Sequence, residues 1–386
     1  MDALKQDLED LRRKKLYRSL QNVSFQKGSR IRIGRRLFIN FASNNYLGLA
    51  AHPRIARKAG EAARVWGAGS GASRLLSGDL TVHLELEKKL AKFKGEEKAT
   101  VFSSGYLANL GAVTALLNEK DVVLVDRLDH ASLVDAARLS RAKLWVYPHR
   151  DVSGLDKLLS RTKSFRRRLV LTDAYFSMDG TVAPLDSLLE VCRRHRAFLM
   201  IDEAHSTGVF GKNGRGLSEH FGLLGQIDVV MGTLSKALGS VGGFVAGSAF
   251  LRETLVNRSR TFIYTTAPSP AASAAALEAL NIIEKDPRPR RRLWNNVCRL
   301  REGLVSLGFD LMGSEGAIIP LLIGDTRKTI GFGGLLKKEG IFAPAIRPPT
   351  VPRGMDRIRL SVTAAHEEQD LEKLLAVMKK ARTRFL

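Results

Sequence analysis

Between about residues 99 and 247, this 386-residue sequence alternates short apolar runs with segments of helical periodicity. The apolar runs predict seven strands, at residues 99–103, 122–126, 144–148, 169–173, 198–202, 229–233 and 243–246. Helical patterns lie between several of them, at residues 105–117, 131–139 and 185–196. Because the runs are continuously apolar, both faces of the sheet should be covered. The pattern therefore predicts an α/β fold with a mostly parallel sheet between layers of helices.

Polar residues follow five of these predicted strands. In open parallel sheets, ligands bind beyond the carboxyl ends of the strands. This rule brings five clusters to one edge of the sheet: Ser103-Ser104-Gly105-Tyr106, Asp129-His130, Tyr175-Phe176-Ser177, Asp202 with His205, and Thr233 with Lys236. The sequence therefore predicts a ligand site at this edge.

The flanking segments predict smaller units. Residues 4–20 have the pattern of a basic amphipathic helix, residues 32–41 that of a β-ribbon, and the glycine-rich residues 67–78 that of a loop. After residue 247 the chain becomes helical, with a break at residues 287–292. The tail predicts strands at 318–323 and 357–362 and helices at 330–338 and 367–382. We predict an N-terminal helix and ribbon (1–45), a large ligand-binding domain (46–285) and a small C-terminal α/β domain (286–386).

The net charge of +23 is the unusual global property of the chain. A nucleic-acid-binding protein would combine clustered basic residues with stacking aromatic residues. Basic clusters occur at residues 12–15, 166–168 and 288–292, but they are scattered and no aromatic-rich motif accompanies them. A solvated basic surface is the favoured interpretation, nucleic-acid binding is the alternative, and the charge would also attract an anionic substrate such as an acyl-CoA.

The sequence carries no sign of secretion or membrane insertion. Its longest apolar stretch, residues 271–283, is too short and too interrupted by polar residues to cross a bilayer. Residues 1–7 lack the pattern of a signal peptide, and their acids disfavour a transit peptide. Two cysteines, Cys192 and Cys298, indicate neither a disulfide framework nor a cysteine-based zinc site. We expect a cytoplasmic protein without a membrane partner.

Two residues at the predicted edge suit one particular cofactor. Lys236 offers an amine that can form a Schiff base with an aldehyde, and Asp202 offers a fixed negative charge for a protonated ring nitrogen. Pyridoxal 5'-phosphate (PLP) needs both, because it acts as an electron sink through an imine and a pyridinium. Gly239 and Gly242 follow the lysine and allow a ligand to approach the backbone closely. The pair predicts PLP as the cofactor.

Neighbouring residues at this edge fit the same ligand. Gly105 and Tyr106 open a helix whose free N–H groups can bind phosphate, although an ordinary strand-to-helix turn has the same pattern. His130 can stack on a flat ring, and His205 can reach a ring hydroxyl oxygen. A metal pair of Asp202 and His205 is the alternative, but a convincing third and fourth ligand are missing from the sequence, so we predict no metal.

Three further polar residues extend the predicted site. Ser177 and Thr233 supply hydroxyls at strand ends, although such residues are also common turn formers. Arg359 alternates with apolar neighbours on a predicted strand of the small domain. Its guanidinium can hold a substrate carboxylate through paired hydrogen bonds, and a structural arginine is the alternative.

Six short segments recur in the order typical of one family. They are residues 41–49 (FASNNYLGL), 69–74 (GSGASR), 129–132 (DHAS), 176–180 (FSMDG), 202–208 (DEAHSTG) and 233–236 (TLSK). With them the chain resembles the α-oxoamine synthases, which are fold-type I PLP-dependent enzymes, over nearly its whole length. The resemblance implies a large domain with a mostly parallel sheet, a small C-terminal α/β domain, and a homodimer with active sites at the subunit interface.

The resemblance also implies a role for each matched residue. Lys236 would bind PLP covalently and shuttle protons, and Asp202 would pair with the ring nitrogen. His130 would stack on the ring, and His205 would contact its hydroxyl oxygen. The other cofactor contacts would come from a helix start, two strand ends and a segment of a partner subunit: Gly105, Tyr106, Ser177, Thr233, Thr265 and Thr266. The substrate contacts would come from His130 and four further residues: Asn44, Arg359 for the amino-acid carboxylate, and Arg18 and Thr350 for the acyl group.

Residues 345–352 and 360–366 resemble those of the family members that condense L-alanine with pimeloyl-CoA, or a pimeloyl carrier protein, in biotin synthesis. The resemblance thus implies a PLP-dependent acyltransferase that releases CO2. The closest alternative is a glycine-using synthase, chiefly 2-amino-3-oxobutyrate CoA ligase, or an enzyme that accepts both substrate pairs. Synthases of 5-aminolevulinate and of sphingolipid precursors are more distant alternatives. A non-catalytic relative would be expected to lack Lys236.

Overall fold

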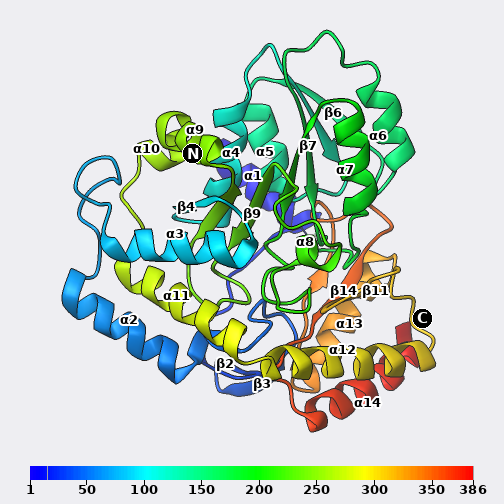
Figure 1. The fold of residues 1–386 in the computed structure, drawn as a ribbon. Helices are drawn as coiled ribbons and strands as arrows, with labels where there is room; N and C mark the ends of the chain where they lie inside the picture. Colours follow the sequence, from blue (N-terminus) through cyan, green and yellow to red (C-terminus); the bar gives the residue numbers. More distant parts are fainter. Residues whose placement is uncertain (15, 386) are drawn as a thin grey trace.

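A seven-stranded sheet forms the centre of the computed structural model, which describes residues 1–14 and 16–385 (Figure 1). The strand order is β4-β10-β9-β8-β7-β5-β6. These strands are β4 (Lys98–Phe102), β5 (Val122–Asp126), β6 (Lys143–Tyr147), β7 (Arg168–Asp173), β8 (Phe198–Asp202), β9 (Val229–Thr233) and β10 (Gly243–Gly247). Within this sheet, β10 runs against its neighbours and β5 to β9 are parallel, which confirms the prediction of a mostly parallel sheet.

Helices cover both faces of the sheet, because the side chains of each strand alternate between two apolar cores. In β5, Val122 and Leu124 belong to one core, and Val123 and Val125 belong to the other. The first core is covered by α3 (Thr81–Lys94), α6 (Val152–Leu159), α7 (Leu185–Arg194) and α11 (Pro270–Lys285). The second is covered by α4 (Gly105–Leu116), α5 (Ala131–Leu139), α9 (Ala249–Arg258) and α10 (Arg260–Ile263).

The N-terminal segment differs from its prediction. Helix α1 (Asp2–Arg13) ends before residue 20, because it buries none of its residues and so gains no packing that would extend it. The predicted ribbon is a three-stranded antiparallel unit of β1 (Val23–Lys27), β2 (Arg30–Ile33) and β3 (Arg36–Asn40). Strand β1 was missed because its alternation of apolar and polar residues, Val23-Ser24-Phe25-Gln26, is very short, and all five residues of the strand are exposed.

Two small sheets lie beside the large one. Strand β3 pairs in parallel with β12 (Ile341–Phe342), so the N-terminal strands join a C-terminal element. The second small sheet has the order β11-β14-β13, with β11 (Ile318–Leu322), β13 (Ala345–Ile346) and β14 (Arg357–Ser361). Three further elements lie outside the sheets: the 14-residue helix α2 (Pro53–Trp66) and the short elements η1 (Leu49–Ala51) and α8 (Leu217–His220).

The C-terminal helices are α12 (Arg288–Ser306), α13 (Thr326–Lys338) and α14 (Glu368–Phe385), and α12 packs along α14 (Figure 1). The predicted break at residues 287–292 is wrong in extent. Helix α12 begins at Arg288, because proline is tolerated in a first helical turn, where its missing N–H would have no partner. The division of the chain at residues 45 and 285 stays a prediction.

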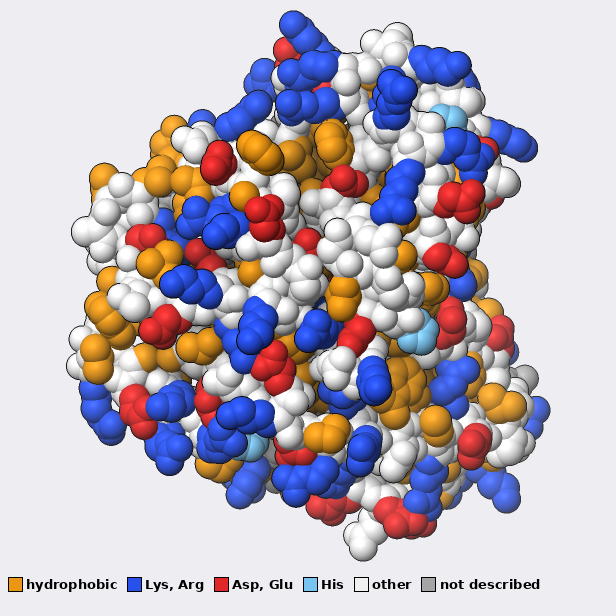
Figure 2. All heavy atoms as spheres, viewed as in Figure 1, with side chains coloured by type: hydrophobic (Ala, Val, Ile, Leu, Met, Phe, Trp, Pro, Cys, Tyr) orange, Lys and Arg blue, Asp and Glu red, His pale blue; other side chains and the backbone are white. Residues whose placement is uncertain are grey.

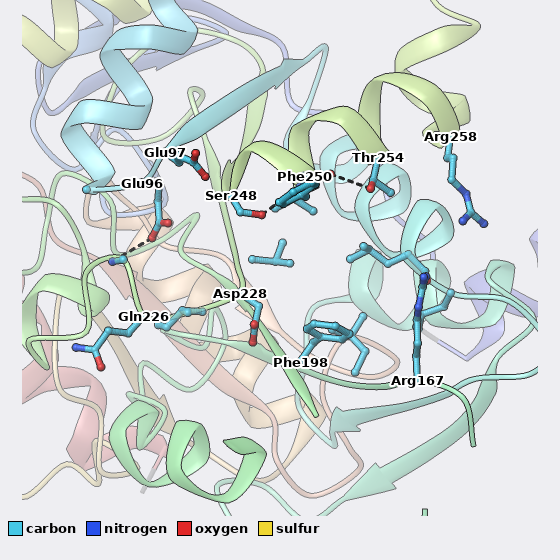
Figure 3. Close-up of a pocket in the computed structure, with 18 residues that line it drawn as sticks. Glu96, Glu97, Arg167, Phe198, Gln226, Asp228, Ser248, Phe250, Thr254 and Arg258 are labelled. Carbon is cyan, nitrogen blue, oxygen red and sulfur yellow. Dashed lines mark hydrogen bonds between the residues drawn. The ribbon is translucent and has the colours of Figure 1, made fainter. Parts of the chain in front are cut away.

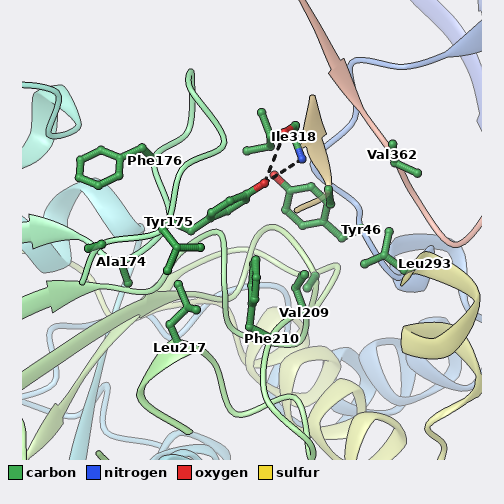
Figure 4. Close-up of a cluster of buried hydrophobic side chains, with 14 of the residues drawn as sticks. Tyr46, Ala174, Tyr175, Phe176, Val209, Phe210, Leu217, Leu293, Ile318 and Val362 are labelled. Atoms are coloured by element: carbon green, nitrogen blue, oxygen red, sulfur yellow. Dashed lines mark hydrogen bonds between the residues drawn. The ribbon is translucent and has the colours of Figure 1, made fainter. Parts of the chain in front are cut away.

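A tyrosine joins the loop after β7 to the small sheet. The Tyr175 hydroxyl accepts a hydrogen bond from the Ile318 N–H (3.0 Å) and donates to the Ile318 carbonyl (3.4 Å), within a cluster of buried side chains (Figure 4). Tyr46 and Phe210 belong to the same cluster. The C-terminal elements are therefore held directly beside the carboxyl edge of the large sheet.

The distribution of basic side chains and the apolar character of the helices can both be examined along the described residues. Lys and Arg side chains are dispersed over the face shown in Figure 2, with acidic side chains among them. Along residues 1–14 and 16–385, none of the helices has the length and apolar character needed to cross a membrane.

His366 gives the fold a predictable response to acid. It is fully buried and stacks on Phe41 with ring centroids 4.1 Å apart, and its Nδ1 accepts the Thr363 N–H at 3.0 Å. Burial lowers the pKa of His366 to about 4 from its usual 6.5. As the pH falls, the unfolded chain therefore takes up a proton on this histidine at a higher pH than the folded protein does. The stability that neutral, buried His366 gives the fold is fully present above pH 6.5 and is lost as the pH falls toward 4.

Wild-type protein is expected to lose about 3 kcal/mol more unfolding free energy than His366→Gln between pH 6.5 and pH 4, from the shift in this one pKa. Urea unfolding at several pH values measures the difference between the two proteins. Buried carboxyls that titrate in the same range contribute equally to both and cancel. If the unfolding free energies of the wild type and His366→Gln fell equally between pH 6.5 and pH 4, the lowered pKa of buried His366 would be contradicted.

Candidate active site

The carboxyl ends of β7, β8 and β9 meet the starts of α4 and α5 around a cavity of about 130 Å³. Seven of the residues predicted for the site line this cavity. The complete lining is Gly105, Tyr106, Asn109, His130, Ser132, Asp173, Tyr175, Asp202, Ala204, His205, Met231, Thr233 and Lys236. Residues up to 131 positions apart in the sequence, from Gly105 to Lys236, therefore share one small space.

Lys236 follows β9 in a tight turn and is half-buried. Gly239 closes the turn by donating its N–H to the Lys236 carbonyl (3.0 Å), and at its φ of +65° a Cβ would clash with the backbone of Ala50. Burial lowers the pKa of the Lys236 amine, and the charges of Asp202 and Asp173 oppose this shift. The amine makes no hydrogen bond to any residue that the structure describes, so it is available to a ligand.

Both oxygens of the Asp202 carboxylate are held by donors. The Asn109 Nδ2 donates to Oδ2 at 2.8 Å, and the Ala204 N–H donates to Oδ1 at 2.8 Å. The same Asn109 nitrogen donates to Ser132 Oγ (2.8 Å), which lies 2.8 Å from His130 Nδ1. A continuous chain of hydrogen bonds thus joins the carboxylate at the end of β8 to the imidazole at the start of α5.

Asn109→Leu is expected to destabilise the protein by about 1–3 kcal/mol, because the buried Asp202 carboxylate loses its side-chain donor. The free energy of unfolding in urea measures this loss. Thr114→Val is the matched control on the same helix, since the one hydrogen bond of the Thr114 hydroxyl to a described residue goes to the Leu110 carbonyl one turn earlier. Equal losses in the two variants would contradict a specific role for Asn109 in holding Asp202.

The two histidines of the cavity favour their neutral forms. Burial lowers the pKa of His130, although its ring opens into the cavity, and lowers that of the enclosed His205 further. His205 Nδ1 lies 2.7 Å from the hydroxyl of Tyr46, whose complete burial raises the pKa of the phenol to about 12. With the phenol as donor, His205 carries its proton on Nε2 and can donate it to a ligand.

Two more carboxyl groups lie around the cavity. Asp129 accepts the N–H of Asp173 (2.8 Å) and that of Asp126 (2.9 Å). Burial raises the pKa of Asp129 and of Asp173, and for Asp173 the neighbouring charge of Asp202 adds to the shift. The neutral forms of Asp129 and Asp173 are thus favoured, and Asp202 differs from them in that donors hold both of its oxygens. Within residues 1–14 and 16–385, no three His, Cys, Asp or Glu side chains are grouped to hold a metal.

The start of α4 presents backbone N–H groups to the cavity. Ser104 caps this 12-residue helix, accepting the Leu107 N–H at 3.1 Å. Gly105 packs so closely on Gly243 that a Cβ on Gly243 would lie 2.6 Å from the Gly105 Cα, and a Cβ on Gly105 would touch Thr233 at 3.4 Å. The absence of a side chain at residue 105 leaves the helix end open to an anion, which helix N-termini bind well.

Arg359 lies outside the residues that line the cavity. From β14 it donates through Nε to the Ser177 carbonyl (2.7 Å), and its Nη2 lies 3.4 Å from Asn44 Oδ1. Ser177 and Asn44 likewise lie outside the lining. The charge of Arg359 still reaches the cavity, since it lowers the pKa of Lys236 and of His205.

The remaining predicted residues lie at the periphery. Arg18 Nη2 donates to Thr350 Oγ1 at 2.9 Å, so two residues assigned to the same substrate from distant parts of the chain are in contact. Thr265 and Thr266 do not line the cavity, and Thr265 Oγ1 donates to the Thr266 carbonyl at 3.4 Å. Tyr106 reaches the cavity and donates its hydroxyl to Asp135.

Three residues that line the cavity, Asn109, Ser132 and Asp173, were not predicted to have a role in the site. Asn109 is a fully buried amide in a mostly apolar helix, and Asp173 ends a buried strand, so each was a polar residue in an apolar context. Such positions are signals for a site, since a buried polar side chain needs a partner.

The chain is similar to known proteins over nearly its whole length. Residues 37–378 match the family "Aminotransferase class I and II". The chain therefore belongs to this family. An 8-amino-7-oxononanoate synthase of Geobacter sulfurreducens is 47% identical over 96% of each chain, and a putative one of Bacillus licheniformis is 51% identical over 87% of this chain and 88% of its own.

Solved structures show the same fold. A serine palmitoyltransferase of S. paucimobilis superposes with a TM-score of 0.94 at 32% identity, covering 99% of this chain and 97% of its own. An 8-amino-7-oxononanoate synthase of Francisella tularensis gives 0.78 at 27% identity, covering 90% and 98%. The predicted fold-type I architecture and the resemblance to the α-oxoamine synthases are thus confirmed.

Proposed function

We propose that this protein condenses L-alanine with a pimeloyl thioester to give 8-amino-7-oxononanoate, CO2 and the free thiol of CoA or of a carrier protein. The observation that carries this proposal is the convergence of Lys236, Asp202 and two neutral histidines on one cavity. It is supported by relatives that bear the name of this synthase and align over nearly the full length of the chain.

The residues of the cavity fit PLP. Lys236 supplies an amine without a protein partner, Asp202 a carboxylate whose oxygens both accept hydrogen bonds, and Gly105 an open helix start for the phosphate. Thr233 and Tyr106 border the same space. When bound, PLP supplies an electron sink for the negative charge that develops on the amino-acid α-carbon.

The residues of this chain would then divide the work of the reaction. The Lys236 amine takes the α-proton of the amino acid and later returns a proton to the product, which its lowered pKa favours. Asp202 keeps the ring nitrogen protonated, and the Asn109 amide holds the carboxylate in place. His130 covers one face of the ring, and His205 donates from Nε2 to the ring hydroxyl oxygen.

The substrates would be held from the small sheet and the chain termini. Arg359 takes the amino-acid carboxylate beside Asn44, and Ser177 orients the guanidinium through its carbonyl. Arg18 and Thr350, already in contact, meet the acyl group of the thioester. The net charge of +23 favours the approach of such an anionic thioester.

We also propose that two copies of the chain form a homodimer in the cytoplasm. Thr265 and Thr266 lie off the cavity of their own chain and would reach the phosphate site of the partner. Helix α1 buries none of its residues, and Leu4, Leu8 and Leu11 are exposed on it. An apolar stripe of this kind is expected to pack against another surface, which a second copy would provide.

The release of CoA thiol from two substrate pairs tests the function. Protein loaded with PLP is expected to release thiol much faster from L-alanine with pimeloyl-CoA than from glycine with acetyl-CoA, and mass spectrometry should identify 8-amino-7-oxononanoate. Preference for the second pair would overturn the substrate assignment in favour of 2-amino-3-oxobutyrate CoA ligase activity. Absence of thiol release from both pairs, with PLP bound, would overturn the condensation with CoA thioesters.

A further inference from the structure

A second cavity, of about 650 Å³, lies at the opposite edge of the large sheet (Figure 3). The strands β7, β8 and β9 each contribute a residue to both cavities. Strand β8 contributes Phe198 to this one and Asp202 to the first, at opposite ends of its five residues. At the usual rise per residue the two positions are roughly 13 Å apart, so the cavities are separate.

Charged side chains of opposite sign occupy different sides of this second cavity. Glu96 and Glu97 project at one side, Arg167 and Arg258 at the other, and Asp228 lies between them (Figure 3). The cavity therefore offers attraction to a cation at one end and to an anion at the other.

These five side chains form no salt bridge with a described residue, although the charges of Lys94 and Arg193 act on Glu96 and Asp228 from farther away. The carboxylates accept only backbone N–H groups: Glu96 from Gly225 (3.3 Å), Glu97 from Ala249 (2.7 Å) and Asp228 from Leu199 (2.8 Å). Burial raises the pKa of Glu96 to about 7 and also raises that of Asp228. A bound cation would remove part of this cost, because it stabilises the ionised forms.

The arginine side is similarly incomplete. Arg167 Nη1 donates to the Leu116 carbonyl at 2.8 Å, and the Arg258 guanidinium has no hydrogen bond to a described residue. Two phenylalanines lie between the charged sides, with Phe198 47% exposed and Phe250 81% exposed. Exposed aromatic rings in a concave site are typical of ligand or partner contact.

We propose that this cavity binds a linear zwitterion, with its carboxylate at Arg167 and Arg258, its ammonium at Glu96 and Glu97, and its methylene chain across Phe198. An ω-amino carboxylate has this order of groups, and the cavity volume falls in the range of small-molecule sites. A molecule with one charge would leave the other side of the cavity without a partner.

The product of the proposed reaction, 8-amino-7-oxononanoate, has the same order of groups: a carboxylate, a methylene chain and, beyond the ketone, an amine on C8 next to the terminal methyl group. Its assignment as the natural ligand rests on the proposed function, whereas the zwitterion site itself does not. The protein would then bind its own product at a second site, separate from the active-site cavity. The strands shared by the two cavities offer a direct physical connection between them.

Isothermal titration calorimetry of the PLP-loaded protein with 8-aminooctanoate, octanoate and octylamine tests the site. We expect saturable binding of 8-aminooctanoate and weaker binding of the two singly charged probes. Arg258→Gln should weaken 8-aminooctanoate and octanoate about tenfold and leave octylamine unchanged, since one charge-assisted contact is lost. Glu97→Gln, which keeps a hydrogen-bond acceptor, should weaken 8-aminooctanoate and octylamine and leave octanoate unchanged.

Arg327→Gln on α13 and Glu302→Gln on α12 are matched controls, because both residues are exposed and make no ion pair with a described residue. The proposal is overturned if 8-aminooctanoate does not bind, or if its binding is insensitive to Arg258→Gln and Glu97→Gln. A second copy of the chain covering the cavity would also overturn it, and Phe250→Ser would then shift the protein toward monomer. Binding with the expected pattern, but without 8-amino-7-oxononanoate formation, would overturn the proposed function and leave the site standing.

Discussion

Lys236→Ala is expected to reduce thiol release from L-alanine and pimeloyl-CoA by at least about 10³-fold, as is typical when an essential catalytic group is removed. The lysine amine is the group in the cavity that can both bind the PLP aldehyde and move the α-proton. No other lysine lines this cavity within the described residues. Steady-state assays at saturating PLP measure the change.

The fold should tolerate this substitution, because Lys236 is only half-buried and its amine makes no hydrogen bond to a described residue. The variant is therefore expected to unfold at a urea concentration near that of the wild type. Lys285→Ala, at an exposed lysine of α11, is the control and should keep full turnover. Turnover in Lys236→Ala within tenfold of the wild type would contradict the assignment.

Lys94→Met is expected to cost about 3–5 kcal/mol of unfolding free energy, because it breaks a buried ion pair. Lys94 and Glu203 form an ion pair in which both side chains are fully enclosed. Glu203 also accepts the Ser218 N–H at 2.7 Å and directly follows Asp202 in the chain. Removal of the ammonium leaves a buried carboxylate without its counter-charge.

Urea unfolding of the variant measures this cost, and Lys94→Met combined with Glu203→Gln should recover part of it, since the second change removes the stranded charge. Lys89→Met is the matched control. It breaks the more exposed pair with Glu284, which should contribute no more than about 1 kcal/mol. Similar losses from Lys94→Met and Lys89→Met would contradict the role given to burial.

The fold of the large sheet was accessible from sequence because its strands are buried on both faces. A strand such as β8 is then apolar along its length and ends at a polar residue that marks the carboxyl edge. The exposed strand β1 lacks this signal, and its pairing was missed. The pairing of β3 with β12 joins residues about 300 positions apart and depends on tertiary packing, so local patterns could not reveal it.

The site was predictable where a residue follows a strand or begins a helix, as for Asp202 and His130. Residues inside elements were harder to find. Asn109 lies in the middle of the sequence of α4, and its importance depends on the approach of Asp202 and Ser132 from other elements. Arg18 and Thr350 carry no local signal that connects them. The family resemblance assigned both to the acyl substrate, and the two side chains are in contact.

Borohydride reduction of the PLP-loaded protein, followed by peptide mass spectrometry, identifies the lysine that binds the cofactor. Reduction makes the bond between the cofactor and its lysine permanent, so the modified residue can be identified. We predict a single modified peptide, carrying the cofactor on Lys236, and no such peptide from Lys236→Ala. Modification of a different lysine, or none at all, would contradict the assignment of Lys236 and its cavity as the PLP site.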